Sequence, residues 1–164
     1  MKGEESVLYY FAYGSCMDEE SFKGTVGEGR YQVLGAATLP DYRLAFTMYS
    51  EYRQGGVADI VPAPGEEVEG VLYRLDPEAL PDLDKREGVD VGHYRRICVK
   101  VRHRESWIEA ETYTVVNKSE EEIRPSLAYL RLIHQGAVQQ LSESYRLRLV
   151  EHWRERFGVH LLFK

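Results

Sequence analysis

The most constraining feature of this chain is an apolar run over residues 7–13 that stops at Gly14. β-Branched and aromatic residues dominate the run, a pattern typical of a β-strand that is buried on both faces. Gly14 and Ser15 then allow backbone N–H groups to approach a ligand closely, because glycine tolerates unusual dihedral angles and carries no obstructing side chain. The run therefore predicts a central strand followed by an anion-holding loop. A strand-to-helix turn in which the glycine serves geometry alone is the alternative.

Three acidic residues follow this loop at Asp18, Glu19 and Glu20. Acidic side chains are favoured in the first turn of a helix, where free N–H groups carry partial positive charge. We therefore expect a helix to begin over residues 17–22, with its free N–H groups directed toward the same space as the loop.

The rest of the chain alternates strand-like segments with Gly, Pro and charged turns and has fewer helical patterns. Asp76 and Pro77 predict the start of a helix over residues 79–86 that stops near Gly88, with Pro81 bending or shortening it. Ser126 and Ser142 precede two further helical patterns near the C-terminus. Strands are expected at residues 31–37, 43–49, 56–61, 68–75, 94–102 and 107–116. This order predicts an α+β fold, a small and mostly antiparallel β-barrel or curled mixed sheet flanked by helices, with C-terminal helices.

Length and charge narrow the class of protein. The chain has 164 residues, which corresponds to about one domain, so we expect a single domain over residues 1–164. Its formal net charge of -6 argues against a general nucleic-acid binder. The apolar N-terminal run is too short for a signal peptide or a membrane span, so we expect no membrane partner.

Cysteine and histidine usage gives no sign of a metal site. The two cysteines, Cys16 and Cys98, form no CxxC motif, and the histidines are scattered. Free cysteines without pairing motifs are typical of a reducing compartment, and we expect the protein to be cytoplasmic.

Glu87 is the strongest candidate for a proton carrier. It ends a helix-like segment and is followed by Gly88, where a side chain can turn toward a cavity. The surrounding residues are heavily charged, so a solvated face in which Glu87 pairs with Lys85 or Arg86 is the alternative. Asp59 and Tyr113 are weaker candidates for the same cavity.

Four motifs in order resemble the gamma-glutamylcyclotransferases, which have the AIG2-like fold, and they extend from about Tyr10 to Tyr129. They are Phe-Ala-Tyr-Gly-Ser at residues 11–15, Pro-Gly-Glu-Glu-Val-Glu-Gly-Val-Leu-Tyr at 64–73, Leu-Asp-Lys-Arg-Glu-Gly-Val at 83–89 with Gly-His-Tyr at 92–94, and Pro125-Ser126 with Tyr129.

The resemblance implies a reaction in which the free α-amino group of a γ-glutamyl compound attacks its own γ-carbonyl group. The products are 5-oxoproline and a free amine, and no cofactor or metal is required. Glu87 matches the catalytic glutamate, which takes a proton from the α-ammonium group and can return it to the leaving nitrogen. The partner implied is a small-molecule γ-glutamyl substrate, and members of the family are dimers or monomers.

The resemblance also implies a set of substrate-binding residues. The loop formed by Tyr13, Gly14 and Ser15 matches the substrate-holding loop. Tyr94 and Tyr129 match tyrosines in or beside the pocket, and Tyr10 lies on the strand that leads into the loop.

Cys16 departs from the family pattern, because the loop usually continues Tyr-Gly-Ser-Asn. A thiol donates a hydrogen bond only weakly where an asparagine amide donates well. This leaves open a non-catalytic module that binds a γ-glutamyl compound or 5-oxoproline. It also leaves open a thiol nucleophile whose pKa a nearby helix N-terminus would lower. The leaving amine is undefined, and we expect it to contact loops at residues 50–55 and 119–124.

Overall fold

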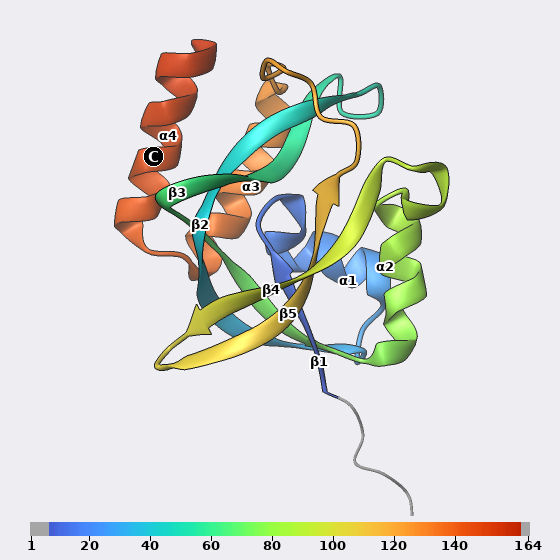
Figure 1. The fold of residues 1–164 in the computed structure, drawn as a ribbon. Helices are drawn as coiled ribbons and strands as arrows, with labels where there is room; N and C mark the ends of the chain where they lie inside the picture. The colour runs from blue at the N-terminus through green and yellow to red at the C-terminus, as the bar shows by residue number, and fades with distance from the viewer. Residues whose placement is uncertain (1–6, 162–164) are drawn as a thin grey trace, which may run out of the picture.

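A computed structural model describes residues 7–161, in which five strands form a closed barrel in the order β1-β3-β2-β4-β5. The first strand, β1 (Leu8–Ala12), is antiparallel to β3 and parallel to β5, with Tyr10 opposite Glu111. Figure 1 shows β1 running through the middle of the barrel wall with helices on either side. The predicted α+β fold with a small mixed barrel is therefore confirmed.

The barrel is built around one long hairpin, β2 (Tyr31–Ser50) and β3 (Gly55–Leu75). The sequence predicts four separate strands here, and that prediction is wrong because the Pro-Asp and Pro-Gly pairs bend the strands without ending them. Asp41 has a positive φ of 65° at a register shift in β2, and its side chain accepts a hydrogen bond from Gly65 N at 2.9 Å. A β-bulge thus absorbs the bend while pairing continues on both sides.

A second hairpin closes the barrel. The strands β4 (Tyr94–His103) and β5 (Ser106–Val115) pair antiparallel along their whole length. β4 joins the long hairpin through the pair Thr38 and Arg102, and β5 joins β1. Both strands agree with the sequence prediction to within about one residue.

Short helices cover the end of the barrel near β1. A 3₁₀ turn (Ser15–Met17) leads to α1 (Glu19–Val26), and another (Pro77–Ala79) leads to α2 (Leu80–Arg86). A third 3₁₀ turn (Val89–Val91) connects α2 to β4. Pro81 lies in the first turn of α2, where proline costs no intrahelical hydrogen bond.

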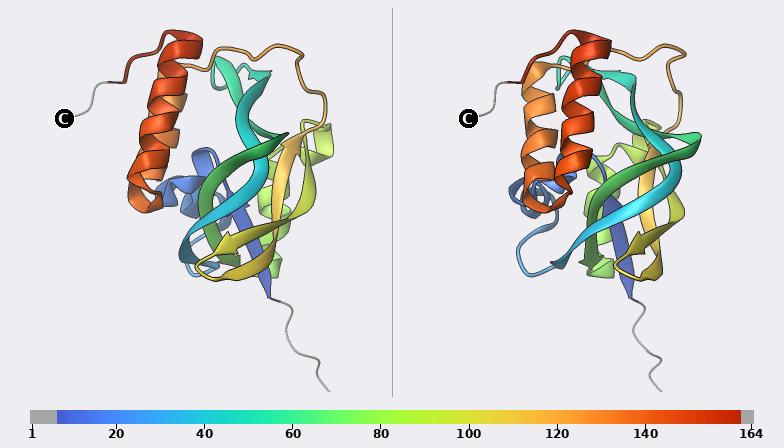
Figure 2. Two further views of the ribbon diagram at one scale, coloured as in Figure 1. Left: turned by 60° about the vertical axis from the view of Figure 1, so that its left-hand side comes forward. Right: turned by 90° about the vertical axis from the view of Figure 1, so that its left-hand side faces the viewer.

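The C-terminal helices α3 (Leu127–Gln140) and α4 (Glu143–Phe157) pack side by side against the long hairpin (Figure 2). Each begins as the sequence predicts, because the hydroxyl of Ser126 accepts a hydrogen bond from Tyr129 N and that of Ser142 from Tyr145 N. The apolar stripes of these helices face inward, and Ile133 and Trp153 are buried. Packing of these stripes holds both helices on the barrel.

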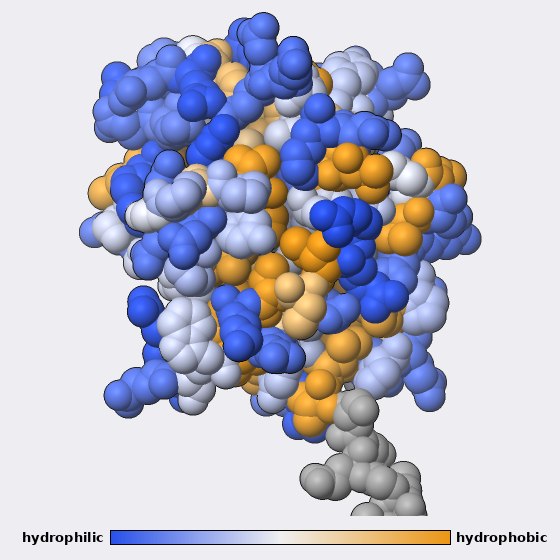
Figure 3. All heavy atoms as spheres, in the orientation of Figure 1, coloured by the Kyte–Doolittle hydropathy of each residue, from blue (hydrophilic) through white to orange (hydrophobic). Residues whose placement is uncertain are grey.

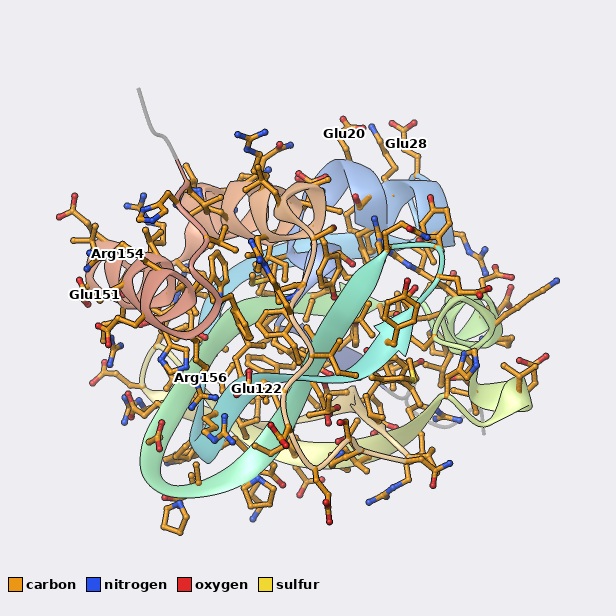
Figure 4. All side chains as sticks on the ribbon, turned by 90° about the horizontal axis from the view of Figure 1, so that it is seen from above. Glu20, Glu28, Glu122, Glu151, Arg154 and Arg156 are labelled. Atoms are coloured by element: carbon orange, nitrogen blue, oxygen red, sulfur yellow. The ribbon has the colours of Figure 1, made fainter. Side chains whose placement is uncertain are left out.

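The segment between β5 and α3 forms backbone hydrogen bonds with the outer part of the long hairpin. Ile123 N donates to Phe46 O at 2.8 Å, and Gly56 N donates to Arg124 O at 3.0 Å. Seen from above, Glu122 and Arg156 point toward each other between this segment and α4 (Figure 4). Arg43 also pairs with Glu122 at 3.0 Å, so one carboxylate connects β2, the segment and α4.

On the face drawn in Figure 3, apolar residues reach the surface in a band that hydrophilic residues border on both sides. None of the helices within residues 7–161 is both long enough and apolar enough to cross a membrane.

The close packing at Gly56 predicts a large stability difference between two glycine substitutions. A Cβ atom at Gly56 would lie 2.0 Å from Ile123 O, whereas one at Gly24 in α1 would meet nothing within 4 Å. We expect Gly56→Ala to lower the free energy of unfolding by about 1–3 kcal/mol or more through overpacking. Gly24→Ala should raise it by about 0.5–1 kcal/mol, because alanine favours the helix. Urea unfolding of both variants checks this, and equal stabilities would contradict the described packing.

Candidate active site

A small cavity of about 30 Å³ lies at the end of β1, under the loop that begins at Gly14. It is walled mainly by tyrosines, with one carboxylate and one thiol among them. Its lining residues are Tyr10, Tyr13, Gly14, Cys16, Ala58, Glu87, Tyr94, Tyr113 and Tyr129. We call this space the inner cavity.

Three tyrosines of the inner cavity, Tyr13, Tyr94 and Tyr129, form hydrogen bonds to the backbone. Tyr94 donates to Ala58 O at 2.6 Å, and the Tyr129 hydroxyl accepts from Ala58 N at 3.0 Å. Tyr13 donates to Tyr113 O at 2.7 Å. Burial raises the pKa of Tyr129 to about 12 and those of Tyr13 and Tyr94 well above their usual value. These phenols therefore stay protonated and uncharged near pH 7.

Gly14 lies where two segments approach each other closely. A Cβ atom there would lie 3.2 Å from Ala58 Cβ and 3.7 Å from the Tyr129 hydroxyl. The first hydrogen bond of the following 3₁₀ turn is Met17 N to Gly14 O, so the N–H groups of Ser15 and Cys16 precede its hydrogen-bonded part. These two amides are the donors that the turn does not use itself.

The helix predicted after the loop forms, but its first turn does not serve the inner cavity. Asp18 caps α1 by accepting from Ser21 N at 3.1 Å. Gln135 and Gln139 of α3 donate to the same carboxylate at 3.1 and 3.0 Å. The buried Asp18 thus joins α1 to α3, and the expectation that free N–H groups of this helix face the ligand space is wrong at Ser21.

Glu87 is the C-cap residue of α2 and lines the inner cavity. It is the last helical residue by its dihedral angles, and Gly88 reverses the chain with φ of 70°. Burial raises the pKa of its carboxyl group to about 7, although the charges of Arg86 and Arg53 act to lower it. Among the described residues it forms no ion pair with Lys85 or Arg86, so the alternative of a solvated ion pair fails.

A larger pocket of about 900 Å³ opens beside the inner cavity, and Glu87, Tyr94 and Tyr129 line both. We call it the outer pocket. The hairpin tip over residues 49–53 forms one wall, and Tyr52 is 87% exposed there. The Arg53 guanidinium carbon lies 5.2 Å from the centroid of the Tyr129 ring, within cation–π range. The outer pocket therefore carries a cation close to Glu87.

The sequence indicates Arg86 only as an ion-pair partner of Glu87, but its guanidinium turns to the loop. It donates to Ser15 Oγ at 3.2 Å, to Cys16 Sγ at 3.0 Å and to Thr25 Oγ1 at 2.8 Å. Ser15 consequently does not line the inner cavity, unlike the other predicted site residues. The three acceptors are 61 to 71 residues away in the sequence, so no local pattern indicated these contacts.

The Cys16 thiol does not have the lowered pKa that a helix N-terminus would give. Cys16 is buried, and burial raises its pKa to about 11, outweighing the opposing charge of Arg86. His93 lines the outer pocket instead of the inner cavity that holds Cys16. The thiol is therefore neutral near pH 7 and poorly suited to nucleophilic attack.

Two further candidates from the sequence have different fates. Tyr113 lines the inner cavity and donates to Asp84 Oδ1 at 2.5 Å. Asp59 faces neither the cavity nor the solvent, because its side chain is fully buried. Lys118 Nζ lies 2.8 Å from its Oδ2, and Thr47, Thr114 and the N–H groups of residues 60 and 115 also donate to it.

In the part of the chain that the structure describes, no group of three or more His, Cys, Asp or Glu side chains is arranged to hold a metal ion. The chemistry available to the inner cavity is that of one carboxyl group, one thiol and several neutral phenols.

Comparison with known proteins places the chain in a family. The model of the AIG2-like family matches residues 67–149. Gamma-glutamylcyclotransferase of Mus musculus is 34% identical over 152 residues, which cover 89% of this chain and 79% of that protein. The putative gamma-glutamylcyclotransferase YkqA of Bacillus subtilis (strain 168) is 39% identical over 150 residues, or 88% of this chain, and this chain spans only 52% of YkqA.

Solved structures agree with the sequence matches. A gamma-glutamyl cyclotransferase structure superposes with a TM-score of 0.82 at 32% identity, covering 88% of this chain and 86% of that chain. The structure of YkqA gives a TM-score of 0.83 at 36% identity and covers 92% of this chain and 55% of that one. The chain belongs to the gamma-glutamylcyclotransferase family.

Proposed function

We propose that this protein cyclises a γ-glutamyl amino acid or γ-glutamyl amine to 5-oxoproline and releases the free amine, with Glu87 as the general base and acid. The observation that carries the proposal is the Glu87 carboxyl group, whose pKa of about 7 is raised by burial beside the Gly14 loop. The names of the family members supply the reaction class.

The reaction needs one proton carrier. The α-ammonium group must lose a proton before its nitrogen can attack the γ-carbonyl carbon. A new C–N bond then closes the five-membered ring, the original amide C–N bond breaks, and the leaving nitrogen takes up a proton. Glu87 can accept the first proton and return it to the leaving amine, since a pKa near the working pH suits both transfers.

The remaining acceleration comes from positioning. Both reacting groups belong to one molecule, and orienting such groups can supply up to about 7–11 kcal/mol. The unused N–H groups of Ser15 and Cys16 are suited to bind the α-carboxylate or the developing oxyanion, a type of contact worth about 2.7–4 kcal/mol. Tyr10, Tyr94 and Tyr129 would exclude water from the ring-closing atoms.

The inner cavity and the outer pocket would bind different parts of the substrate. The inner cavity of about 30 Å³ accommodates only a small polar group such as one end of the glutamyl unit. The outer pocket of about 900 Å³ is large enough for the leaving amine and whatever it carries. Arg53 and the exposed Tyr52 border the outer pocket, so the leaving amine would contact the loop over residues 50–55, whereas residues 119–124 do not line this pocket.

A non-catalytic binding module is the second candidate, and the observation that favours it is Cys16 at the position of the family's asparagine. Such a protein would bind 5-oxoproline or a γ-glutamyl compound without converting it. The retained carboxyl group of Glu87 favours the enzyme, because a pure binder gains little from a base beside the reacting amine.

Substitution of the base tests the proposed reaction. We expect Glu87→Gln to reduce 5-oxoproline release by about 10²–10⁴-fold, the usual contribution of general acid–base catalysis. Mass spectrometry of the products from a panel of γ-glutamyl amino acids and γ-glutamyl amines measures this. Glu78→Gln is the matched control, since Glu78 is exposed near the start of the same helical segment.

The stability of Glu87→Gln separates loss of catalysis from loss of folding. The raised pKa means that ionising Glu87 destabilises the fold above pH 4.5, so the neutral variant should be at least as stable as the wild type at pH 8. Wild-type turnover that survives in Glu87→Gln would overturn the role of Glu87. No wild-type turnover, together with thermal stabilisation by 5-oxoproline, would favour the binding module.

The dependence of kcat/KM on pH gives an independent check. Glu87 must be deprotonated to act as a base, so kcat/KM should fall about tenfold per pH unit below an apparent pKa of about 7. A profile that stays flat from pH 5.5 to 8 would contradict the assignment.

A further inference from the structure

We infer that Arg86 is a positioning residue, whose guanidinium fixes the Ser15–Met17 turn relative to Glu87. The inference rests on the proposed function, because that gives Glu87 its role. Its evidence is the set of contacts that Arg86 makes. Arg86 ends α2 directly before Glu87, so the same backbone carries the carboxyl group and the group that holds the loop.

The contacts of Arg86 join three segments. Its Nη1 atom donates to Cys16 Sγ at 3.0 Å and to Thr25 Oγ1 of α1 at 2.8 Å, and its Nη2 atom donates to Ser15 Oγ at 3.2 Å. A planar guanidinium presents its donors in a fixed fork, so these contacts fix direction as well as distance. The positions of the loop and the carboxyl group are thereby coupled.

The Ser15–Met17 turn is also attached to the protein core by a second contact. Tyr73 donates to Cys16 O at 2.7 Å, and its ring stacks on Phe22 of α1 with 4.0 Å between centroids. The turn is thus attached by its main chain to the barrel and by its side chains to α2. Loss of Arg86 would leave the first attachment intact and release the second.

The contacts also account for Cys16 at the position of the family's asparagine. A thiol is a weak donor, but here it serves as an acceptor for a cation. Ser15 likewise accepts from Arg86, which leaves its own O–H hydrogen free to donate elsewhere. The side chains of Ser15 and Cys16 are therefore both acceptors for the same cation of α2.

The charge of Arg86 acts on Glu87 as well. It opposes the effect of burial and lowers the pKa of the carboxyl group, as Arg53 does from the hairpin tip. The other titratable groups around Glu87 are Tyr49, Glu51, Tyr52 and His93 in the outer pocket and the thiol and phenols of the inner cavity. Arg86 and Arg53 are the two cations that bear on the ionisation of Glu87.

The test compares Arg86→Gln, Arg86→Lys and the exposed control Arg95→Gln on β4. Amide hydrogen exchange reports the order of the turn, and carbon-13 titration of the carboxyl groups reports the pKa of Glu87. We expect Arg86→Gln to reduce protection of the turn amides about tenfold or more, as befits loss of charged hydrogen bonds, and to raise the pKa of Glu87. The fall of kcat/KM at acid pH should therefore begin at a higher pH in Arg86→Gln than in the wild type.

Arg86→Lys separates position from charge. A lysine ammonium keeps the positive charge but cannot reproduce the fork to three acceptors, so the pKa of Glu87 should stay near that of the wild type while protection of the turn still falls. If Arg86→Gln fails to fold, protection of the turn amides is compared between Arg86→Lys and the wild type instead.

Protection and pKa values in both Arg86 variants that match those of Arg95→Gln would overturn the inference. Neither measurement needs turnover. If the wild type releases no 5-oxoproline while Arg86→Gln still loosens the turn, the proposed function fails and the positioning role stands.

Discussion

The buried carboxylate of Asp59 is the interaction on which the site depends. β1 separates β3 from β5 in the barrel, but it ends at Ala12, and beyond that point nothing in the strand order joins the two. Asp59 of β3 bridges them by accepting from Thr114 and Val115 N, while Lys118 neutralises its charge at 2.8 Å. Because the Asp59 side chain is fully buried, loss of these donors would leave an unpaired buried carboxylate and destabilise the fold.

Ala58, the residue before Asp59, contacts the tyrosines of the inner cavity directly. Ala58 uses its carbonyl group to hold Tyr94 and its N–H group to hold Tyr129, and its Cβ atom would lie 3.2 Å from a Cβ atom at position 14. The gap left by the short β1 is therefore filled by the loop on one side and by Glu87 on the other. Burial among neutral phenols raises the pKa of Glu87, and two arginines keep it near 7.

Local signals in the sequence predicted much of the fold and of the site. Hydroxyl caps at Ser126 and Ser142 and the glycine at residue 88 act through neighbours a few residues away, so their patterns were readable. The merging of four predicted strands into two was not, because a bulge at Asp41 depends on pairing with Gly65.

The remaining site features depend on distant contacts. From the sequence, Asp59 resembles an acid of a pocket or of the surface. The fold shows that it pairs with Lys118, which is 59 residues away. Arg86 looked like a partner for Glu87, but the loop that it contacts lies 70 residues earlier. In both cases the sequence identified a charged residue, and only the fold identified its partner.

The most direct test of this account is a crystal structure of Glu87→Gln with an uncleaved γ-glutamyl compound. The account predicts that the α-amino nitrogen lies within hydrogen-bond distance of the side chain at position 87. It also predicts a substrate oxygen at the N–H groups of Ser15 and Cys16, with the leaving amine in the outer pocket beside Arg53. A γ-glutamyl group bound with its amino end away from position 87, or in the separate groove beside Trp107, would contradict it.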